Sequence, residues 1–134
     1  FNLKDQFNGV TFQRAVQKIG DHHPIAVLVF HIGYYIGAVL DVVNGKPLMA
    51  HDKFSFDLPQ VNSESEWQDL VSKTFNEIEQ LASGIEKMKD AQLWEFFAHE
   101  KYGSMYRNFH GLLQHSYYHL GQIALIKKLQ ELKQ

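Results

Sequence analysis

The chain has 134 residues, of which 45% are hydrophobic and 21% are charged, and its formal net charge is −2. This length and composition predict one soluble globular domain over residues 1–134, and the small net charge gives no electrostatic reason to expect nucleic acid or an anionic membrane as a partner. The absence of cysteine excludes disulfides, thiolate nucleophiles and cysteine-ligated zinc, and it fits a reducing cytoplasm, where we expect the protein to be located.

The N-terminal part of the chain predicts two short helices. Residues 3–7 resemble the end of a helix that breaks at Asn8-Gly9, and Thr11 can cap a second helix over residues 12–19. The sequence begins neither with methionine nor with the pattern of a signal peptide. We therefore expect that the N-terminal part of the first helix is missing from this sequence.

A long helix is predicted from Pro24 to about residue 43. Proline suits a first turn because its missing N–H has no partner there, and Asn44-Gly45 provides a stop. The apolar run over residues 24–40 is at the short limit for a membrane span, is interrupted by His31 and lacks basic flanks. We interpret it as a core helix of a soluble protein that has no membrane partner.

A long loop and a third helix follow. Residues 46–62 contain two prolines and several polar residues, and Ser63 with Glu66 matches a capping box. The apolar positions of the third helix recur at alternating steps of four and three residues, which is typical of a helix that packs lengthwise along a neighbour. These positions are Trp67, Val71, Thr74, Ile78, Leu81, Ile85 and Met88.

The C-terminal third of the chain is dominated by one helix. Residues 89–104 fit either a short helix or an irregular crossover with aromatic anchors, and the last helix is predicted to run from Ser104 or Met105 to about Leu132. Strand signals are scarce throughout. Together these elements predict an all-α fold, an antiparallel bundle of three or four long helices with one long loop over residues 46–62.

Histidine is unusually frequent, with eight residues in the chain. His115 and His119 lie about 40° apart on one face of the last helix, with Cβ atoms roughly 6 Å apart, so both can reach one metal ion. Tyr118 and Gln122 fall on the same stripe. It borders an apolar arc formed by Leu112, Leu113, Leu120, Ile123 and Ala124. The pair lacks the glutamate of the H-E-x-x-H zinc motif, and hydrogen-bonded histidines at the edge of a core explain the same spacing.

His31 offers a third ligand from another helix. It interrupts an apolar run, and an imidazole without a partner in a core costs about 1–3 kcal/mol, so it requires either a hydrogen bond or a metal. Three neutral imidazoles with an open position form a common catalytic zinc site, and nickel or iron also suits them. We predict one divalent metal on His31, His115 and His119. The remaining histidines lie in connectors, in loops or off the stripe: His22, His23, His51, His99 and His110.

These residues together resemble the DinB-like (YfiT-like) family of metal-binding four-helix bundles. The similarity rests on His31, on the run S-F-D-L-P-Q followed by E-W before the third helix, and on H-S-Y-Y-H-L-G-Q-I in the last helix, and it covers residues 19–128. The resemblance implies one divalent metal on the three histidines, a longer first helix and homodimers. It also implies that some members transfer or isomerise substrates with a low-molecular-weight thiol that the metal holds.

Three functions are open at this point. The first is a metal-dependent enzyme, a thiol-dependent transferase or hydrolase for a small molecule, in which the metal lowers the pKa of water or thiol and Tyr118 and Gln122 orient the substrate. The second is a non-catalytic ligand-binding module or dimeric scaffold whose metal is structural. The third has no metal, and its histidines are satisfied by internal hydrogen bonds. Tyr117 and Gly121, on the far side of the last helix, fit either a subunit contact or a solvated surface.

Overall fold

The computed structural model describes residues 2–132, so residues 1, 133 and 134 of the predicted domain lie outside the described part. The α-helices are α1 (Leu3–Phe7), α2 (Phe12–Val16), α3 (Ile25–Val43), α4 (Glu64–Glu86) and α5 (Met105–Leu132), and 3-10 turns η1 (Asp52–Phe54), η2 (Asp90–Trp94) and η3 (Glu100–Tyr102) lie in the connections. Residues 2–132 contain no strand, only an isolated bridge between Phe96 and Ser104. The all-α prediction is confirmed.

The long helices begin and end close to the predicted residues. The Ser63 hydroxyl accepts a hydrogen bond from the amide of Glu66 (3.1 Å), so the predicted N-cap of α4 is confirmed. The Glu66 carboxylate accepts from Asn62 (2.7 Å) instead of from Ser63, so the second half of the capping box is shifted by one residue. α2 is shorter than predicted because Gln17 adopts an extended backbone conformation (φ −65°, ψ 129°).

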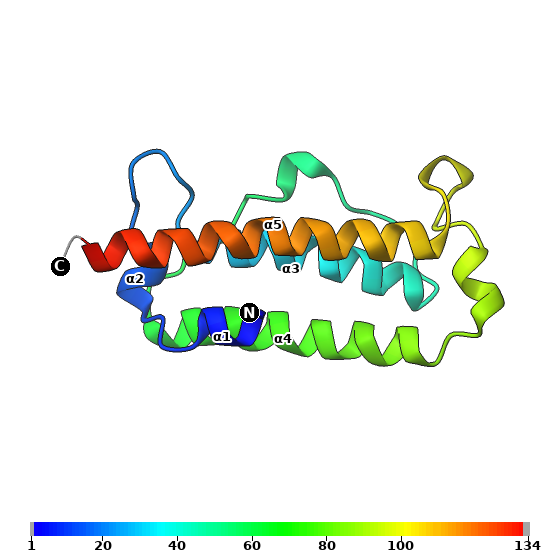
Figure 1. Ribbon diagram of the computed structural model, residues 1–134, viewed down its shortest axis with the longest axis horizontal. Helices are drawn as coiled ribbons and strands as arrows, with labels where there is room; N and C mark the ends of the chain where they lie inside the picture. Colours follow the sequence, from blue (N-terminus) through cyan, green and yellow to red (C-terminus); the bar gives the residue numbers. More distant parts are fainter. Residues whose placement is uncertain (1, 133–134) are drawn as a thin grey trace.

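The three long helices lie side by side along the molecule (Figure 1). Across the contact between α3 and α4, Gly33 faces Thr74 and Gly37 faces Glu77, so residue numbers increase together and the two helices are parallel. α5 is antiparallel to α3. The prediction of an antiparallel arrangement is therefore wrong for α3 and α4. The reason is the length of their connection, which carries the chain back along the roughly 28 Å of α3 before α4 begins.

The core is built around α3. Ten of its 19 residues are buried. α4 contributes Trp67, Thr74 and Leu81, and α5 contributes Leu120, Ile123 and Ile126. The indole N–H of Trp67 donates to the carbonyl of Val10 (2.8 Å) and ties the N-terminal segment to α4. By length and composition alone α3 could also cross a membrane, and the core helix of a soluble protein meets the same criteria.

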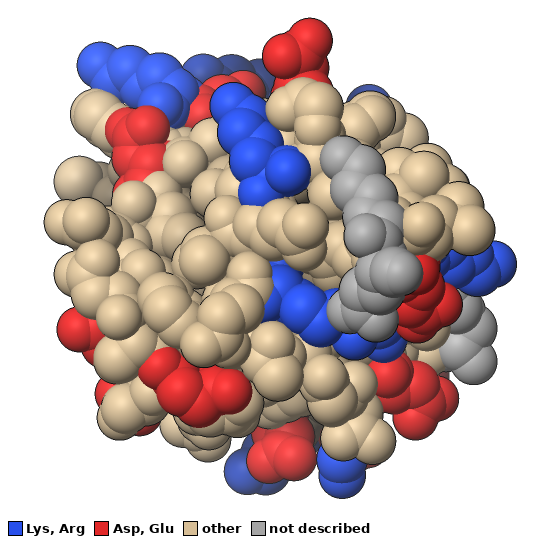
Figure 2. Space-filling view, turned by 90° about the vertical axis from the view of Figure 1, so that its left-hand side faces the viewer, with Lys and Arg blue, Asp and Glu red and all other residues tan. Residues whose placement is uncertain are grey.

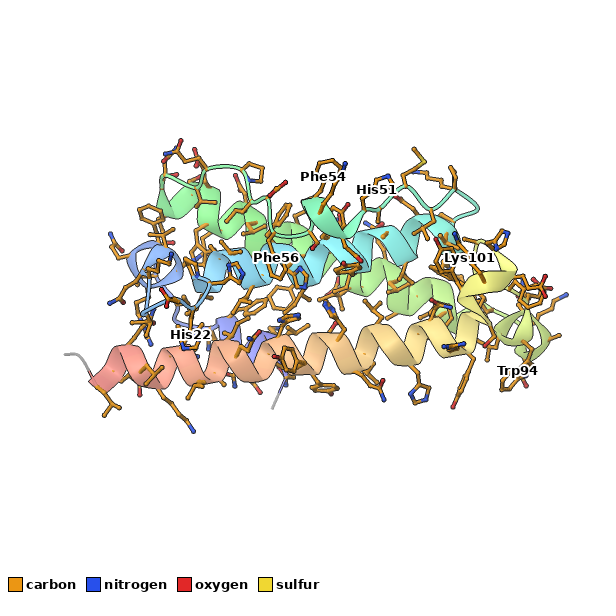
Figure 3. The ribbon with its side chains drawn as sticks, turned by 90° about the horizontal axis from the view of Figure 1, so that it is seen from above. His22, His51, Phe54, Phe56, Trp94 and Lys101 are labelled. Atoms are coloured by element: carbon orange, nitrogen blue, oxygen red, sulfur yellow. The ribbon has the colours of Figure 1, made fainter. Side chains whose placement is uncertain are left out.

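The connection between α3 and α4 runs along α3 (Figures 1 and 3). The Tyr34 hydroxyl forms hydrogen bonds with the amide and the carbonyl of His51 (2.8 and 3.1 Å), and the Tyr35 hydroxyl donates to the Asp52 carboxylate. Ser55 is only 1% exposed. These contacts fix the loop in place and bring Ser55 and its neighbour Phe56 next to the middle of α3.

The connection between α4 and α5 follows the second of the two predicted alternatives, an irregular crossover with an aromatic anchor. It contains two separate 3-10 turns, η2 and η3. Phe97 is buried and provides the anchor, whereas Trp94 and Phe96 are exposed. The amide of Phe97 donates to the carbonyl of Gly103 (2.8 Å), and the amide of Met105 donates to the carbonyl of Glu95 (2.9 Å), so the crossover is held against the start of α5.

Candidate metal centre

Three histidines from two antiparallel helices converge in the interior. Nε2 of His31 lies 2.9 Å from Nε2 of His115, which lies 3.1 Å from Nε2 of His119. All three ligand atoms lie within 4.8 Å of one another, close enough to hold one metal ion. His31 and His119 are buried and His115 is half-buried. The residues that the sequence predicts as metal ligands are therefore brought together.

Two of the three rings are oriented by an oxygen acceptor behind them. His31 Nδ1–H donates to the carbonyl of Ser55 (3.1 Å), and His119 Nδ1–H donates to Oε1 of Gln122 (2.6 Å). A neutral imidazole carries one proton, so a proton on Nδ1 leaves the lone pair on Nε2. Metal-ligating histidines are usually oriented in this way by a second hydrogen bond.

The three Nε2 atoms cannot satisfy one another by hydrogen bonds. Because Nε2 of His31 and Nε2 of His119 each carry a lone pair, Nε2 of His115 is the only one of the three that can donate. Its single N–H cannot form good hydrogen bonds with both lone pairs at once. His115 Nδ1 is buried and has no hydrogen-bond partner among the described residues, so it favours neither tautomer of that ring. A divalent cation would accept all three Nε2 lone pairs at once. The donor set therefore fits a metal better than it fits a closed hydrogen-bond network.

The surroundings keep His31 and His115 in the neutral form that binds metal. Burial lowers the pKa of His31, although the hydrogen bond to the Ser55 carbonyl opposes this shift. Burial, together with the neighbouring His119 and His31, lowers the pKa of His115 to about 4. Both rings are therefore neutral near pH 7, and no proton has to be displaced before a metal binds.

Aromatic rings line the histidine cluster. Phe56 stacks on His31 with 3.8 Å between ring centroids, and His23 stacks on Phe56. Tyr35 contacts both His31 and His115 edge-on, at 5.2 and 4.9 Å. Figure 3 shows Phe56 beside the middle of α3, on the side that faces α5. These rings pack against the cluster on the side of the crossover.

Sequence reasoning missed Ser55, Phe56 and Tyr35. Ser55 and Phe56 belong to the S-F-D-L-P-Q run on which the family resemblance rests, but a loop has no periodicity that places it against a particular helix position. Tyr35 is one helical turn after His31, so its position on the same face was available from the spacing. The other histidines that the sequence ranks lower are all exposed: His22, His23, His51, His99 and His110.

The structure places the two predicted substrate-orienting residues differently. Gln122 accepts a hydrogen bond from His119 and so orients a candidate ligand. Tyr118 packs edge-on against His119 (5.0 Å), but it is 66% exposed and its hydroxyl forms no hydrogen bond within residues 2–132. Tyr118 is about 100° from His119 around α5, which turns it outward. Its role in substrate orientation stays a prediction.

A cavity of about 770 Å³ adjoins the cluster. It lies between α3, the crossover after α3, η3 and the first turns of α5. Its wall includes His115 of the cluster and Tyr35, which packs against His115. Its other polar lining residues are His51, Asp52, Lys101, Tyr102, Arg107 and Asn108. A small molecule in this cavity can therefore reach the histidines.

Replacing Gln122 by alanine should weaken metal binding about 10–100-fold, because His119 loses the acceptor that fixes its ring and its tautomer. Competition with a chromogenic chelator measures this change. Gln114→Ala is the matched control, since Gln114 is exposed on the same helix and its side chain forms no hydrogen bond to the three histidines. Equal affinities of Gln122→Ala and wild type would show that this hydrogen bond does not support the metal.

The candidate centre rests on the geometry and chemistry of this chain itself. No protein-family model, no curated protein and no solved structure matches the chain.

Proposed function

We propose that the protein is a metal-dependent enzyme with one divalent transition metal on the Nε2 atoms of His31, His115 and His119. The observation that carries the proposal is the convergence of three nitrogens that share at most one proton, with oxygen acceptors behind two of the rings. Three neutral imidazoles suit zinc or nickel best, and iron is a further candidate.

Enzymatic use of the metal is supported by the number of ligands and by the adjoining cavity. Structural zinc sites are closed by four protein ligands, whereas catalytic sites have three and leave one position open. Such a metal supplies Lewis acidity and lowers the pKa of a water or thiol at that position. The chain itself contributes a cavity that leads to His115 and, in Gln122 and Ser55, the groups that orient two ligands.

The proposed reaction is group transfer with a low-molecular-weight thiol or hydrolysis of a small molecule, in the cytoplasm. The test uses protein purified without a histidine tag, in metal-free, zinc-loaded and nickel-loaded forms. We expect turnover of thiols with chlorodinitrobenzene, or of nitrophenyl acetate, by a loaded form only. A loaded protein that turns over none of these and no related pair would favour the second candidate, a non-catalytic module whose buried histidines hold a structural metal.

We further propose that the fold is a DinB-like (YfiT-like) four-helix bundle. The long crossover that packs on His31 and the histidines of α5 support this proposal. α1 would stand for the first helix of the bundle, since it packs beside α5 and its Phe7 contacts Phe75 of α4 (5.4 Å between ring centroids). Three of the described helices are long, and α1 has only five residues.

A homodimer through the outer face of α5 is also part of the proposal. Tyr106, Leu113 and Tyr117 lie within about 40° of one another, opposite His115, and are 44%, 53% and 51% exposed. Leu113 was expected in the apolar arc and instead lies here. In Figure 3, α5 forms one edge of the molecule, with no other described element beyond it. A stripe of large exposed apolar residues is typical of a contact surface, and at Gly121 a Cβ atom would meet nothing within 4 Å, so a second helix could approach closely.

The variant Leu113→Arg/Tyr117→Arg should convert a wild-type dimer into a monomer, because it places two like charges at the centre of the contact. Sedimentation velocity measures the mass of both proteins. Ser72→Arg/Asn76→Arg, on an exposed part of α4, is the matched control and should stay dimeric. A wild-type protein that sediments as a monomer, or a double variant that stays a dimer, would contradict this interface.

A further inference from the structure

The cavity beside His115 has two basic residues in its wall. Lys101 belongs to η3 and Arg107 to the first turns of α5. Asp52 is the one carboxylate in the lining, and it already accepts a hydrogen bond from the Tyr35 hydroxyl. The wall therefore has an excess of positive charge beside the histidine cluster.

Neither basic side chain is neutralised by the described residues. The ion pairs found within residues 2–132 join Arg14 to Glu131 and Lys73 to Glu77, and none involves Lys101 or Arg107. On the end of the molecule near α2, acidic and basic side chains are interspersed (Figure 2). Lys101 lies toward the other end, where α5 begins (Figure 3). The two cations in the cavity wall are therefore available to a ligand.

The backbone that carries these cations is well fixed. His99 Nδ1 accepts from the amide of Lys101 (3.1 Å), and the side-chain amide of Asn108 donates to the carbonyls of Tyr102 and Ser104 (both 2.9 Å). At Gly103, where φ is 77°, a Cβ atom would lie 2.9 Å from Cδ of Arg107. Glycine is required both for this backbone conformation and for the arginine to pack across the turn.

One face of α5 connects the basic end of the cavity to the histidine cluster. Arg107, Gly111 and His115 are spaced by four residues and so form one row along α5, about 12 Å from first to last. Gly111 also lines the cavity, and a Cβ atom there would meet nothing within 4 Å. Because Gly111 has no side chain, it leaves space for an extended ligand to lie along α5.

We propose that this cavity binds an anionic small molecule whose carboxylate or phosphate group is held by Lys101 and Arg107 and whose other end lies over Gly111 toward His115. Guanidinium groups bind such oxyanions through paired hydrogen bonds, and a lysine adds a second charge. This inference rests on the proposed function, for which it names the substrate class: a small organic anion whose reactive end, a thiol or a bond to be cleaved, meets the histidine cluster.

The first test uses metal-free protein, so it does not depend on the proposed metal. Inorganic phosphate and acetate are titrated separately at low ionic strength and followed by NMR. We expect binding of at least one of them, weakened about tenfold or more in Lys101→Gln/Arg107→Gln, because charged hydrogen bonds are lost. Lys18→Gln/Lys128→Gln, which removes two exposed charges elsewhere, should bind like wild type. The better of the two probes identifies the oxyanion, and equal binding by wild type and Lys101→Gln/Arg107→Gln would overturn the proposal.

The second test adds the metal. Mercaptooctanoate and mercaptooctanol, which differ only in the carboxylate, are titrated calorimetrically into zinc-loaded protein. Wild type should prefer the carboxylate about tenfold or more, and Lys101→Gln/Arg107→Gln should lose this preference while it binds the alcohol as before. Binding of both thiols without any preference would overturn the anion site alone. Failure of both thiols with retained phosphate or acetate binding would contradict the metal centre and leave the anion site supported.

Discussion

Replacing His115 by alanine should reduce the metal content of the protein from about one ion per chain to nearly none. Nε2 of His115 lies within 3.1 Å of Nε2 of both other histidines, so it is the central one of the three proposed ligand atoms. Without it, one imidazole from α3 and one from α5 are left, and two ligands hold a divalent ion much less tightly than three. Elemental analysis of tag-free protein, purified without chelator, measures this change.

His110→Ala is the matched control for this experiment. His110 lies on the same helix, is exposed and has a hydrogen bond only to the Tyr106 hydroxyl among the described residues (3.0 Å). We expect this variant to retain its metal, and circular dichroism should show that both variants are folded. If His115→Ala and His119→Ala both keep a full complement of metal, the ligand assignment is wrong. If wild type holds no metal and takes up neither zinc nor nickel, the histidines are satisfied internally.

The convergence of His31, His115 and His119 could be predicted from the sequence because its physical signals are local. The spacing of His115 and His119 fixes their common face on any α-helix. His31 stands out because a polar ring in an apolar run needs a partner, and the structure gives it two: the Ser55 carbonyl and the Nε2 of His115. The boundaries of α3, α4 and α5 follow from proline, serine and Asn-Gly signals in the same local way.

The features that the sequence could not predict depend on long-range placement. The direction of α4 relative to α3 depends on where the long crossover between them ends. The hydrophobic periodicity of the two helices gives no information on that position. The same loop places Ser55 and Phe56 against His31 across more than twenty residues of chain. On α5, helical phase alone did not distinguish the buried His119 from the exposed Tyr118, because the edge of the buried face depends on which neighbours cover it.

Adding zinc or nickel to metal-free protein, at about a thousand times the dissociation constant, should raise the free energy of unfolding by about 4 kcal/mol. For a domain of this size the melting temperature should rise by roughly 10 °C or more. The reason is that the ligands come from α3 and α5, which are far apart in sequence, so the unfolded chain does not present all three together. Thermal unfolding followed by circular dichroism, at several metal concentrations, measures the effect.

His115→Ala decides which site causes the stabilisation. A shift in wild type that is absent from His115→Ala assigns it to the three histidines, whereas an equal shift in both proteins would place the bound metal elsewhere, for example at His22 and His23. No shift in either protein would contradict metal binding by the cluster. Because the stabilisation measures binding and not turnover, a large shift combined with the absence of thiol transfer and hydrolysis would identify a structural metal. A large shift combined with turnover requires the open coordination position that three ligands leave.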